Sequence, residues 1–320
     1  RAGAAAEARA KGHLAAQRHN ASPRACGLVA RVLAVGGVAE RVVGCLGLFD
    51  QGRAAGVCVA FSRLCGAALG ALPRLVVAGG ADDHFIAKRE VWALEVSTMR
   101  WRPLPPLLEP RRRHRCVALQ CGTVLCIGGF DSKTVEALAP GAEQWAPRPR
   151  LSFDFSGGGA VACADGSVLL LGGVHNYVRS AEVTRLDPQT GECEALPPLS
   201  SRSAGFGCAP LPDGRVALVG GYSDNGGLTR AEVYDPATGA STRLPDLPAP
   251  CSHAACCWLS DGRLAVLGGY TDAGATSSCW AYSFARNAWE LLPGLNTPRH
   301  SCAAWCVGGC VFVAGGYGLA

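Results

Sequence analysis

The chain has 320 residues, 49% of them hydrophobic, so it is long enough to bury a sizeable core in one large domain or two modest ones. Only 17% of the residues are charged while 42 are glycine and 20 are proline, a balance that favours short strands and tight turns over long amphipathic helices. The net charge of +5 is mild and the basic residues are scattered, which argues against a nucleic-acid partner, and no run of eighteen apolar residues predicts a membrane span.

The first part of the chain differs from the rest in its composition and in its pattern of apolar residues. Residues 1–31 are rich in alanine and arginine with Glu7 as their only acid, which is typical of a disordered leader or a transit peptide. Residues 38–69 carry apolar residues at intervals of three and four, which predicts helices, with a break at 47–52. We therefore separate a leader from a helical segment at 32–72, and both ends of the sequence read as incomplete.

From residue 74 onward the sequence repeats. Six apolar strands end in two adjacent glycines, and their spacings are 49, 44, 48, 48 and 47 residues. Turn dipeptides such as Asp213-Gly214 precede most of these strands, and a turn dipeptide between two apolar runs predicts a hairpin. Further apolar strands and Leu-Pro-rich connections follow, so each unit is predicted to hold four antiparallel strands. The double-glycine strands are RLVVAGG (74–80), TVLCIGG (123–129), SVLLLGG (167–173), RVALVGG (215–221), RLAVLGG (263–269) and CVFVAGG (310–316).

Units of this kind cannot bury both faces of their sheet alone, and packing them around an axis solves the problem, which predicts a β-propeller over residues 74–320. An apolar strand ending in Gly-Gly, followed by a tyrosine-type aromatic and a tryptophan, resembles the kelch-repeat family. The aromatic and tryptophan pair is kept by Trp92 with Trp101 and by Tyr282 with Trp289, and one member of it by Trp145 and by Tyr234.

The kelch resemblance implies an all-β fold with six four-stranded blades in the full-length protein, one for each double glycine. In that family the two ends of the domain commonly pair in one blade to close the ring. Where strands converge on the axis, a side chain on the last strand residue would collide with the next blade, and glycine avoids this. A tryptophan on an outer strand supplies buried area between blades.

The stretch VVGCLGLFDQGRAAGVCVAFSRL, residues 42–64, resembles the F-box, whose short helices dock onto the Skp1 subunit of a cullin-based ubiquitin ligase. The Leu-Pro that usually opens the motif is missing, and Phe61 stands where tryptophan is common. The alternative is a helical hairpin that caps the propeller. The resemblance implies that Skp1 would be contacted by Val42, Val43, Leu46, Val57 and Phe61.

An F-box before kelch repeats implies a substrate-recognition adaptor, in which the propeller holds a protein target for ubiquitination and catalyses nothing itself. Two alternatives stay open. One is a kelch interaction scaffold without ligase coupling, and the other is a propeller enzyme such as an oxidase or an isomerase. We predict no cofactor, and the sequence does not decide between a cytoplasmic and a nuclear location.

The chain contains 17 cysteines, an odd number, and no CxxC pair, which argues against a disulfide framework and against a zinc ribbon. Cys116, Cys208 and Cys256 each lie twelve residues before the first glycine of a double glycine, and Cys302 lies thirteen before. Cysteine at one repeat position acts as a small apolar residue. We therefore predict reduced, packed thiols and no metal site.

No nucleophile with an evident histidine base stands out, so we predict no catalytic residue. His114, His253 and His300 precede the inner strands at equivalent positions and would gather at one mouth of the channel, as solvated loop residues or as part of a binding face. The loops after the double glycines would ring this face, and arginine beside tyrosine suits a short acidic peptide. The predicted target-binding residues are Arg113, His114, Asn176, Tyr177, Arg202, Tyr222, Asn225, Tyr270, Arg299 and His300.

Overall fold

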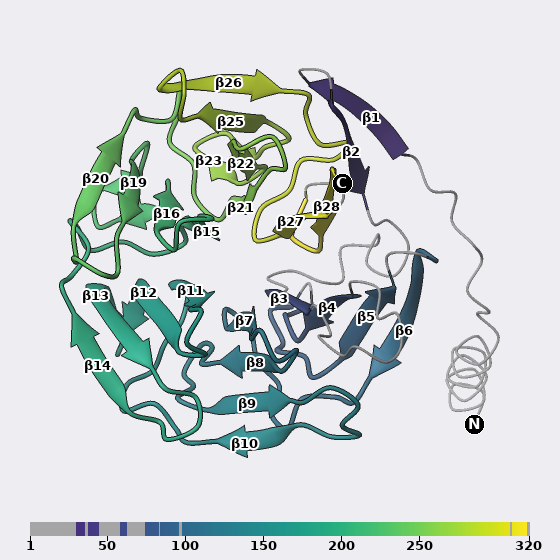
Figure 1. Ribbon diagram of the computed structural model, residues 1–320, viewed down its shortest axis with the longest axis vertical. Coiled ribbons are helices and arrows are strands. Elements are labelled where there is room, and N and C mark those ends of the chain that lie inside the picture. The colour runs from purple at the N-terminus through teal and green to yellow at the C-terminus, as the bar shows by residue number, and fades with distance from the viewer. Residues whose placement is uncertain are drawn as a thin grey trace, which may run out of the picture.

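The structure is a computed structural model that describes residues 30–35, 38–44, 58–62, 74–82, 84–95, 98–307 and 309–318. Its four-stranded sheets are arranged radially around a central axis (Figure 1), which confirms the prediction of an all-β propeller. The described residues form strands and turns without a helix, so none of them forms a helix able to span a membrane.

Five blades are antiparallel meanders, with the inner strand first and the outer strand last. Their strands are, blade by blade, β3 (Cys58–Ser62), β4 (Arg74–Ala78), β5 (Val91–Glu95) and β6 (Arg100–Leu104); β7 (Arg115–Ala118), β8 (Val124–Ile127), β9 (Val135–Leu138) and β10 (Ala146–Arg148); β11 (Gly159–Ala162), β12 (Val168–His175), β13 (Val178–Leu186) and β14 (Cys193–Leu196); β15 (Gly207–Pro210), β16 (Val216–Val219), β19 (Ala231–Tyr234) and β20 (Ser241–Leu244); β21 (Ala255–Trp258), β22 (Leu264–Leu267), β25 (Cys279–Ser283) and β26 (Ala288–Leu292). Small hairpins follow the double glycines of blades 4 and 5, formed by β17 (Tyr222–Ser223) with β18 (Gly226–Gly227) and by β23 (Tyr270–Thr271) with β24 (Gly274–Ala275).

A further sheet joins the two parts of the chain that lie farthest apart in sequence. The strands β27 (Ala303–Val307) and β28 (Cys310–Ala314) pair with β1 (Ala30–Val35) and β2 (Val38–Gly44). In this sheet β2 runs parallel to β28, whereas every pairing inside the five blades is antiparallel. The sheet is therefore no meander of the predicted kind, and a count of six blades stays a prediction.

The helices predicted for residues 38–69 are wrong wherever the structure describes this range. Val42 and Val43 lie in β2, and Phe61 lies in β3, where its Cα pairs with that of Leu75. Short apolar runs fit a strand as well as a helix, and the edges of β4 and β28 provide hydrogen-bonding partners that favour the strand. Leu46, Val57 and residues 1–29 lie outside the described residues.

The double glycines have the predicted role at the axis. In blade 4, Gly220 has a φ of +67° and a Cβ at this position would overlap the carbonyl oxygen of Cys251. The same carbonyl accepts a hydrogen bond of 2.8 Å from the N–H of Gly221. The connection to the next blade thus lies directly against the glycine backbone, where no side chain fits.

Aromatic residues in or next to the two outermost strands tie blades 2, 4 and 5 to the Leu-Pro connection that precedes each of them. The Nε1–H of Trp145 donates to the carbonyl of Pro105 at 2.8 Å, and that of Trp289 donates to Pro245 at 2.8 Å. In blade 4 the hydroxyl of Tyr234 donates to the carbonyl of Pro197 at 2.8 Å. Tyr234 therefore supplies in blade 4 the contact that a tryptophan supplies in blades 2 and 5. This explains how blade 4 keeps the contact without the tryptophan of the aromatic pair.

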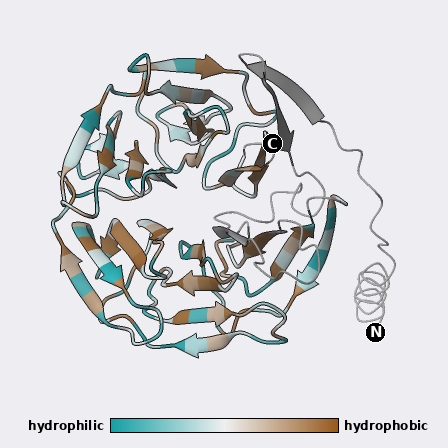
Figure 2. Cartoon of the chain, in the orientation of Figure 1, coloured by the Kyte–Doolittle hydropathy of each residue, from teal (hydrophilic) through white to brown (hydrophobic). Residues whose placement is uncertain are grey.

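The core lies between the blades. Val76 and Ala78 of β4 pack with Val124 and Cys126 of β8, and corresponding clusters join each later pair of blades. Figure 2 shows the hydrophobic residues concentrated on the inner and middle strands, with hydrophilic residues frequent on the outer ones. Burial of these faces fixes the ring and leaves its loops to vary.

Candidate functional site

The loops after the double glycines lie beside the connections that enter the inner strands. Ser252 and Tyr270 exchange backbone hydrogen bonds of 2.9 and 2.7 Å, and His300 and Tyr317 exchange two of 2.9 Å. Both kinds of segment therefore meet at one end of the channel, which we call the mouth face. It corresponds to the face predicted for target binding.

Five residues at equivalent positions, each two before an inner strand, form a belt around the channel. Each has a positive φ, between +54° and +63°. From Gly157 onward, each N–H in the belt donates to the carbonyl of the equivalent residue in the preceding blade, and these four distances are 3.1, 2.8, 2.6 and 2.8 Å in chain order. The belt consists of Arg113, Gly157, Gly205, His253 and Ser301.

Three belt positions carry side chains in a conformation that suits glycine. A left-handed conformation costs a non-glycine residue about 1–2 kcal/mol, so retained side chains at such positions point to a use for them. Arg113, His253 and Ser301 line a hollow of about 70 Å³ at the mouth, with Gly157 and Gly205 among its other walls. The hollow is large enough for one small polar group.

Aromatic rings extend from this hollow across the mouth face. The ring of His253 stacks on Tyr222 at 5.3 Å between centroids and lies edge-on to His300 at 6.2 Å. His300 in turn stacks on Tyr317 at 5.5 Å and contacts Tyr270 at 5.1 Å. These five rings form a continuous arc across blades 4 and 5 and the β27–β28 hairpin.

Large apolar side chains are exposed mainly on the same face. Among the described residues, the loops after the double glycines hold six of the eight most exposed ones. These are Phe85, Ile86, Phe130, Tyr177, Val178 and Tyr270. Exposed apolar groups that gather on one set of loops indicate an interaction surface.

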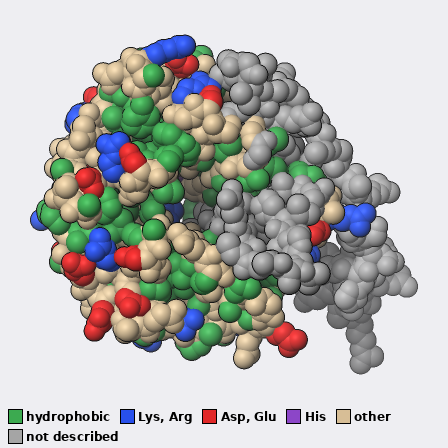
Figure 3. Space-filling model, viewed as in Figure 1, with side chains coloured by type: hydrophobic (Ala, Val, Ile, Leu, Met, Phe, Trp, Pro, Cys, Tyr) green, Lys and Arg blue, Asp and Glu red, His purple; other side chains and the backbone are tan. Residues whose placement is uncertain are grey.

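Charges of both signs surround these groups. Arg112 and Arg113 lie over the ring of Phe130, with Cζ to centroid distances of 4.6 and 5.9 Å. The acids Asp82 and Asp224 are engaged by Lys88 and Arg179. Figure 3 shows acidic and basic side chains interspersed over the described part of one face of the ring, without a patch of a single sign. The arginines near the hollow are therefore a local concentration of positive charge and not part of a larger basic patch on the face shown.

The histidines at the mouth are uncharged at neutral pH. Burial, together with the neighbouring His300, Arg113 and Arg115, lowers the pKa of His253 to about 4. Burial also lowers the pKa of His300. Their rings therefore offer stacking surfaces rather than positive charge, and the cations at the hollow are the arginines.

These shifts predict a loss of stability in mild acid. The unfolded chain takes up a proton at an ordinary histidine pKa of about 6.5, whereas folded His253 takes one up only near pH 4. Its contribution to the free energy of unfolding is therefore present above pH 6.5 and is lost as the pH falls towards 4. We expect urea unfolding to show that His253→Gln weakens the difference between pH 7 and pH 5 by about 1–2 kcal/mol. An unchanged pH dependence in the variant would contradict this.

The belt makes a second prediction about Arg113. Because its φ is +55°, Arg113→Gly relieves backbone strain that Arg113→Ala retains. We expect the glycine variant to be more stable than the alanine variant by about 1 kcal/mol, as measured by urea unfolding. Equal stabilities would show that the left-handed conformation at this position carries no strain.

The structure brings several predicted site residues together at the mouth and separates others. Arg113, Tyr222, Tyr270 and His300 lie at the hollow or in the arc. Three more are exposed in loops of this face, namely Asn176 and Tyr177 at the tip between β12 and β13, and Asn225 between β17 and β18. Arg202 is exposed in the connection that precedes β15.

Two predicted residues serve the interior. Nη1 of Arg299 donates to the carbonyl of Gly315 at 2.9 Å, as Nη1 of Arg111 does to Gly128 at 2.8 Å. His114 is fully buried, and it forms part of the inner wall of the hollow beside Arg113. The predicted target-binding residues did not include Phe85, Arg179 or Tyr317, although Tyr317 follows a double glycine as Tyr222 and Tyr270 do.

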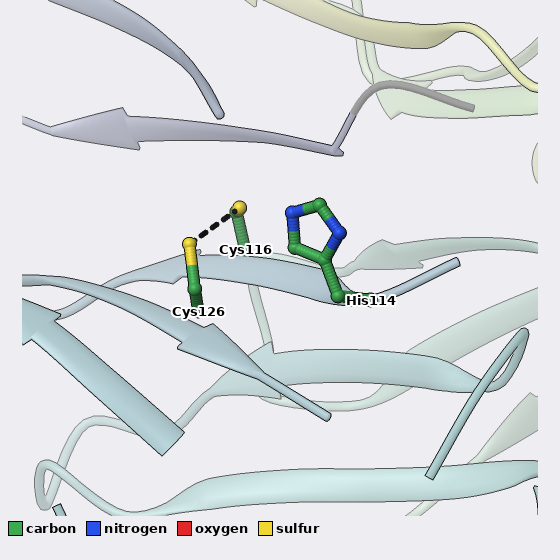
Figure 4. Close-up of side chains that lie close together, drawn as sticks. All are labelled: His114, Cys116 and Cys126. Atoms are coloured by element: carbon green, nitrogen blue, oxygen red, sulfur yellow. Dashed lines mark hydrogen bonds between the residues drawn. The ribbon is translucent and has the colours of Figure 1, made fainter. Parts of the chain in front are cut away.

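His114 lies in a compact group with two cysteines, shown in Figure 4. The ligand atoms of His114, Cys116 and Cys126 all lie within 4.8 Å of one another. The Sγ atoms of the two cysteines are 3.2 Å apart. Cys116 and Cys126 are among the 13 cysteines of residues 116–310 that are free thiols.

Comparison with known proteins gives no family assignment. No protein-family model matches the chain, and no curated protein matches it. A functional conclusion therefore has to come from the fold and from the geometry of the mouth face.

Proposed function

We propose that the protein is a kelch-type propeller that binds a partner protein at its mouth face and acts by binding rather than by catalysis. The kelch assignment is supported by the six phased double glycines and by the hydrogen bonds from Trp145, Tyr234 and Trp289 to proline carbonyls. A sixth blade, built on β27 and β28 and closing the ring, is part of this proposal.

The observation that carries the proposal is the belt, because side chains are kept there at positions where glycine would fit more easily. Arg113 and Arg115 supply positive charge beside a hollow of about 70 Å³, which suits a carboxylate. Exposed Phe130 and Tyr177 lie next to each other, with ring centroids 6.3 Å apart, and offer an apolar surface nearby. The ligand is a short acidic peptide segment with at least one apolar side chain.

The test is to select peptides from a random displayed library on the whole chain and to measure their affinity by fluorescence anisotropy. We expect enrichment of acidic residues, and at least a tenfold loss of affinity for Arg113→Gly and for Tyr177→Ala. Gln189→Ala serves as the control. It changes an exposed residue of the turn between β13 and β14, on the face of the ring opposite to the mouth face. Peptides that bind both mouth-face variants as well as the wild type would rule this site out.

Coupling to a ubiquitin ligase stays a prediction, as does the alternative of a propeller enzyme. The ligase role requires Skp1 to bind the part of the chain that contains Val42 and Phe61. Co-purification of Skp1 with the intact chain tests it, with Gln189→Ala as a folded control. Failure of Skp1 to bind would leave an interaction scaffold without ligase coupling.

A further inference from the structure

Blade 2 carries three metal-binding side chains on one face of its sheet. His114 stands two residues before Cys116, and Cys126 is the direct cross-strand partner of Cys116 in the pairing of β7 with β8. Alternate residues of a strand and directly opposed residues of a pair share a face. Figure 4 shows the imidazole and both sulfur atoms approaching one another from these two strands.

The repeat does not explain this group. In the other sheets the position of Cys126 is apolar, and the position of His114 is filled by residues that vary in size. The equivalents of Cys126 are Val77, Leu170, Leu218, Val266 and Val313, and the described equivalents of His114 are Gly158, Phe206, Ala254 and Cys302. Packing between blades therefore requires neither an imidazole nor a second thiol at these places. Cys208 and Cys256, by contrast, have apolar cross-strand partners.

The group is held inside the protein. His114 and Cys126 are 0% exposed, and the imidazole fits only because residue 79 is glycine, where a Cβ would lie 2.8 Å from Cε1 of His114. Cys116 is only partly buried, whereas the other two side chains are enclosed by the protein.

We propose that His114, Cys116 and Cys126 bind one thiophilic d¹⁰ metal ion, Zn²⁺ or Cu⁺. Thiolate and imidazole ligands suit both ions, and the thiol protons leave to solvent when the metal–sulfur bonds form. Metal–sulfur bonds of about 2.3 Å at a tetrahedral angle set two sulfur atoms about 3.8 Å apart, so binding needs only a small rotation of each cysteine side chain. Cu⁺ is satisfied by three ligands, whereas Zn²⁺ takes a fourth.

The ion would join β7 and β8 at the contact between blades 1 and 2. Cys126 packs there with Val76 and Ala78 of β4. An ion that binds the folded chain and not the unfolded one raises thermal stability by mass action. The site is therefore structural, and it adjoins the hollow of the mouth face, whose lining includes His114.

The test uses the whole chain, stripped of metal by a chelator and kept reduced with a phosphine. Zn²⁺ alone and, without oxygen, Cu⁺ alone are titrated in competition with a chromophoric chelator, and Co²⁺ serves as a spectroscopic probe. We expect one ion to bind per chain, a higher melting temperature, and a thiolate-to-cobalt charge-transfer band. The ion that binds more tightly identifies the metal. Absence of binding by every ion overturns the proposal.

Variants taken from the repeat itself test the ligands without disturbing the fold. Cys116→Ala copies Ala160, Cys126→Val copies Val266, and His114→Ala copies Ala254. Each is expected to weaken binding at least tenfold, while Cys208→Ala, at the same position of blade 4 as Cys116, retains it. Wild-type affinity in Cys126→Val, or a Cys116–Cys126 disulfide in chain isolated without reductant and alkylated at once, contradicts the site.

Discussion

Replacing Gly220 by alanine is expected to destabilise the propeller by about 3–4 kcal/mol, close to the largest effects of single substitutions. The φ of Gly220 is +67°, which strains any other residue, and the added Cβ would overlap the carbonyl oxygen of Cys251. That carbonyl cannot retreat without stretching its 2.8 Å hydrogen bond from the N–H of Gly221. The substitution therefore separates blade 4 from the connection that leads to blade 5.

Gly214 provides the matched control for this prediction. It also has a positive φ, of +88°, but a Cβ there meets nothing within 4 Å. Gly214→Ala should therefore cost only the conformational strain, about 1 kcal/mol. Urea unfolding followed by tryptophan fluorescence gives both values. Equal losses in the two variants would mean that backbone conformation, and not crowding at the axis, selects the double glycine.

The blades were predictable because their signals are local. A double glycine such as Gly220-Gly221 stands at a fixed phase after an apolar strand and a turn dipeptide, and the order of strands in a meander follows the order of the chain. The strands of residues 38–69 were predicted as helices, although β2 pairs with the preceding strand β1 as well as with β28, some 270 residues away, and β3 pairs with β4. The spacing of apolar residues in such short runs does not tell a helix from a strand.

The mouth face was predictable in outline and not in detail. Loops after the double glycines were expected to gather, and Tyr222, Tyr270 and His300 do so. The belt was out of reach because a left-handed conformation at Arg113 or His253 is imposed by the ring and leaves no mark on the residue type. The two glycines in phase with them, at 157 and 205, were the one local sign.

The cysteine prediction shows the same limit. Cys116 stands at a repeat position and was read as a packing residue, as Cys208 is. Cys126 lies at a different phase, and its place opposite Cys116 follows only from the register of β7 with β8. Adjacent to it, Glu136 pairs with Cys126 in the register of β8 with β9, which brings a buried carboxylate into the same region.

The second large loss of stability that we expect comes from removing Arg111, the cation that forms an ion pair with the carboxylate of Glu136. Arg111 and Glu136 form an ion pair whose side chains are 1% and 2% exposed. Arg111 also donates to the carbonyls of Gly128 and Thr134 at 2.8 and 3.1 Å, while Glu136 accepts a hydrogen bond of 2.7 Å from the N–H of Leu108. Arg111→Met is expected to cost about 3–5 kcal/mol, because it leaves a charge buried without its partner.

A double variant distinguishes the charge from the packing. If the unpaired carboxylate is the main cost, Arg111→Met combined with Glu136→Gln should be more stable than Arg111→Met alone, since no buried charge is left. Arg215→Met, which removes an ion pair with Asp213 whose side chains are 42% and 50% exposed, should change the free energy of unfolding by less than about 1 kcal/mol. Urea unfolding of the wild type, these three variants and Glu136→Gln alone completes the comparison. Additive losses in the double variant would show that Arg111 stabilises the ring through its hydrogen bonds to Gly128 and Thr134 rather than by balancing Glu136.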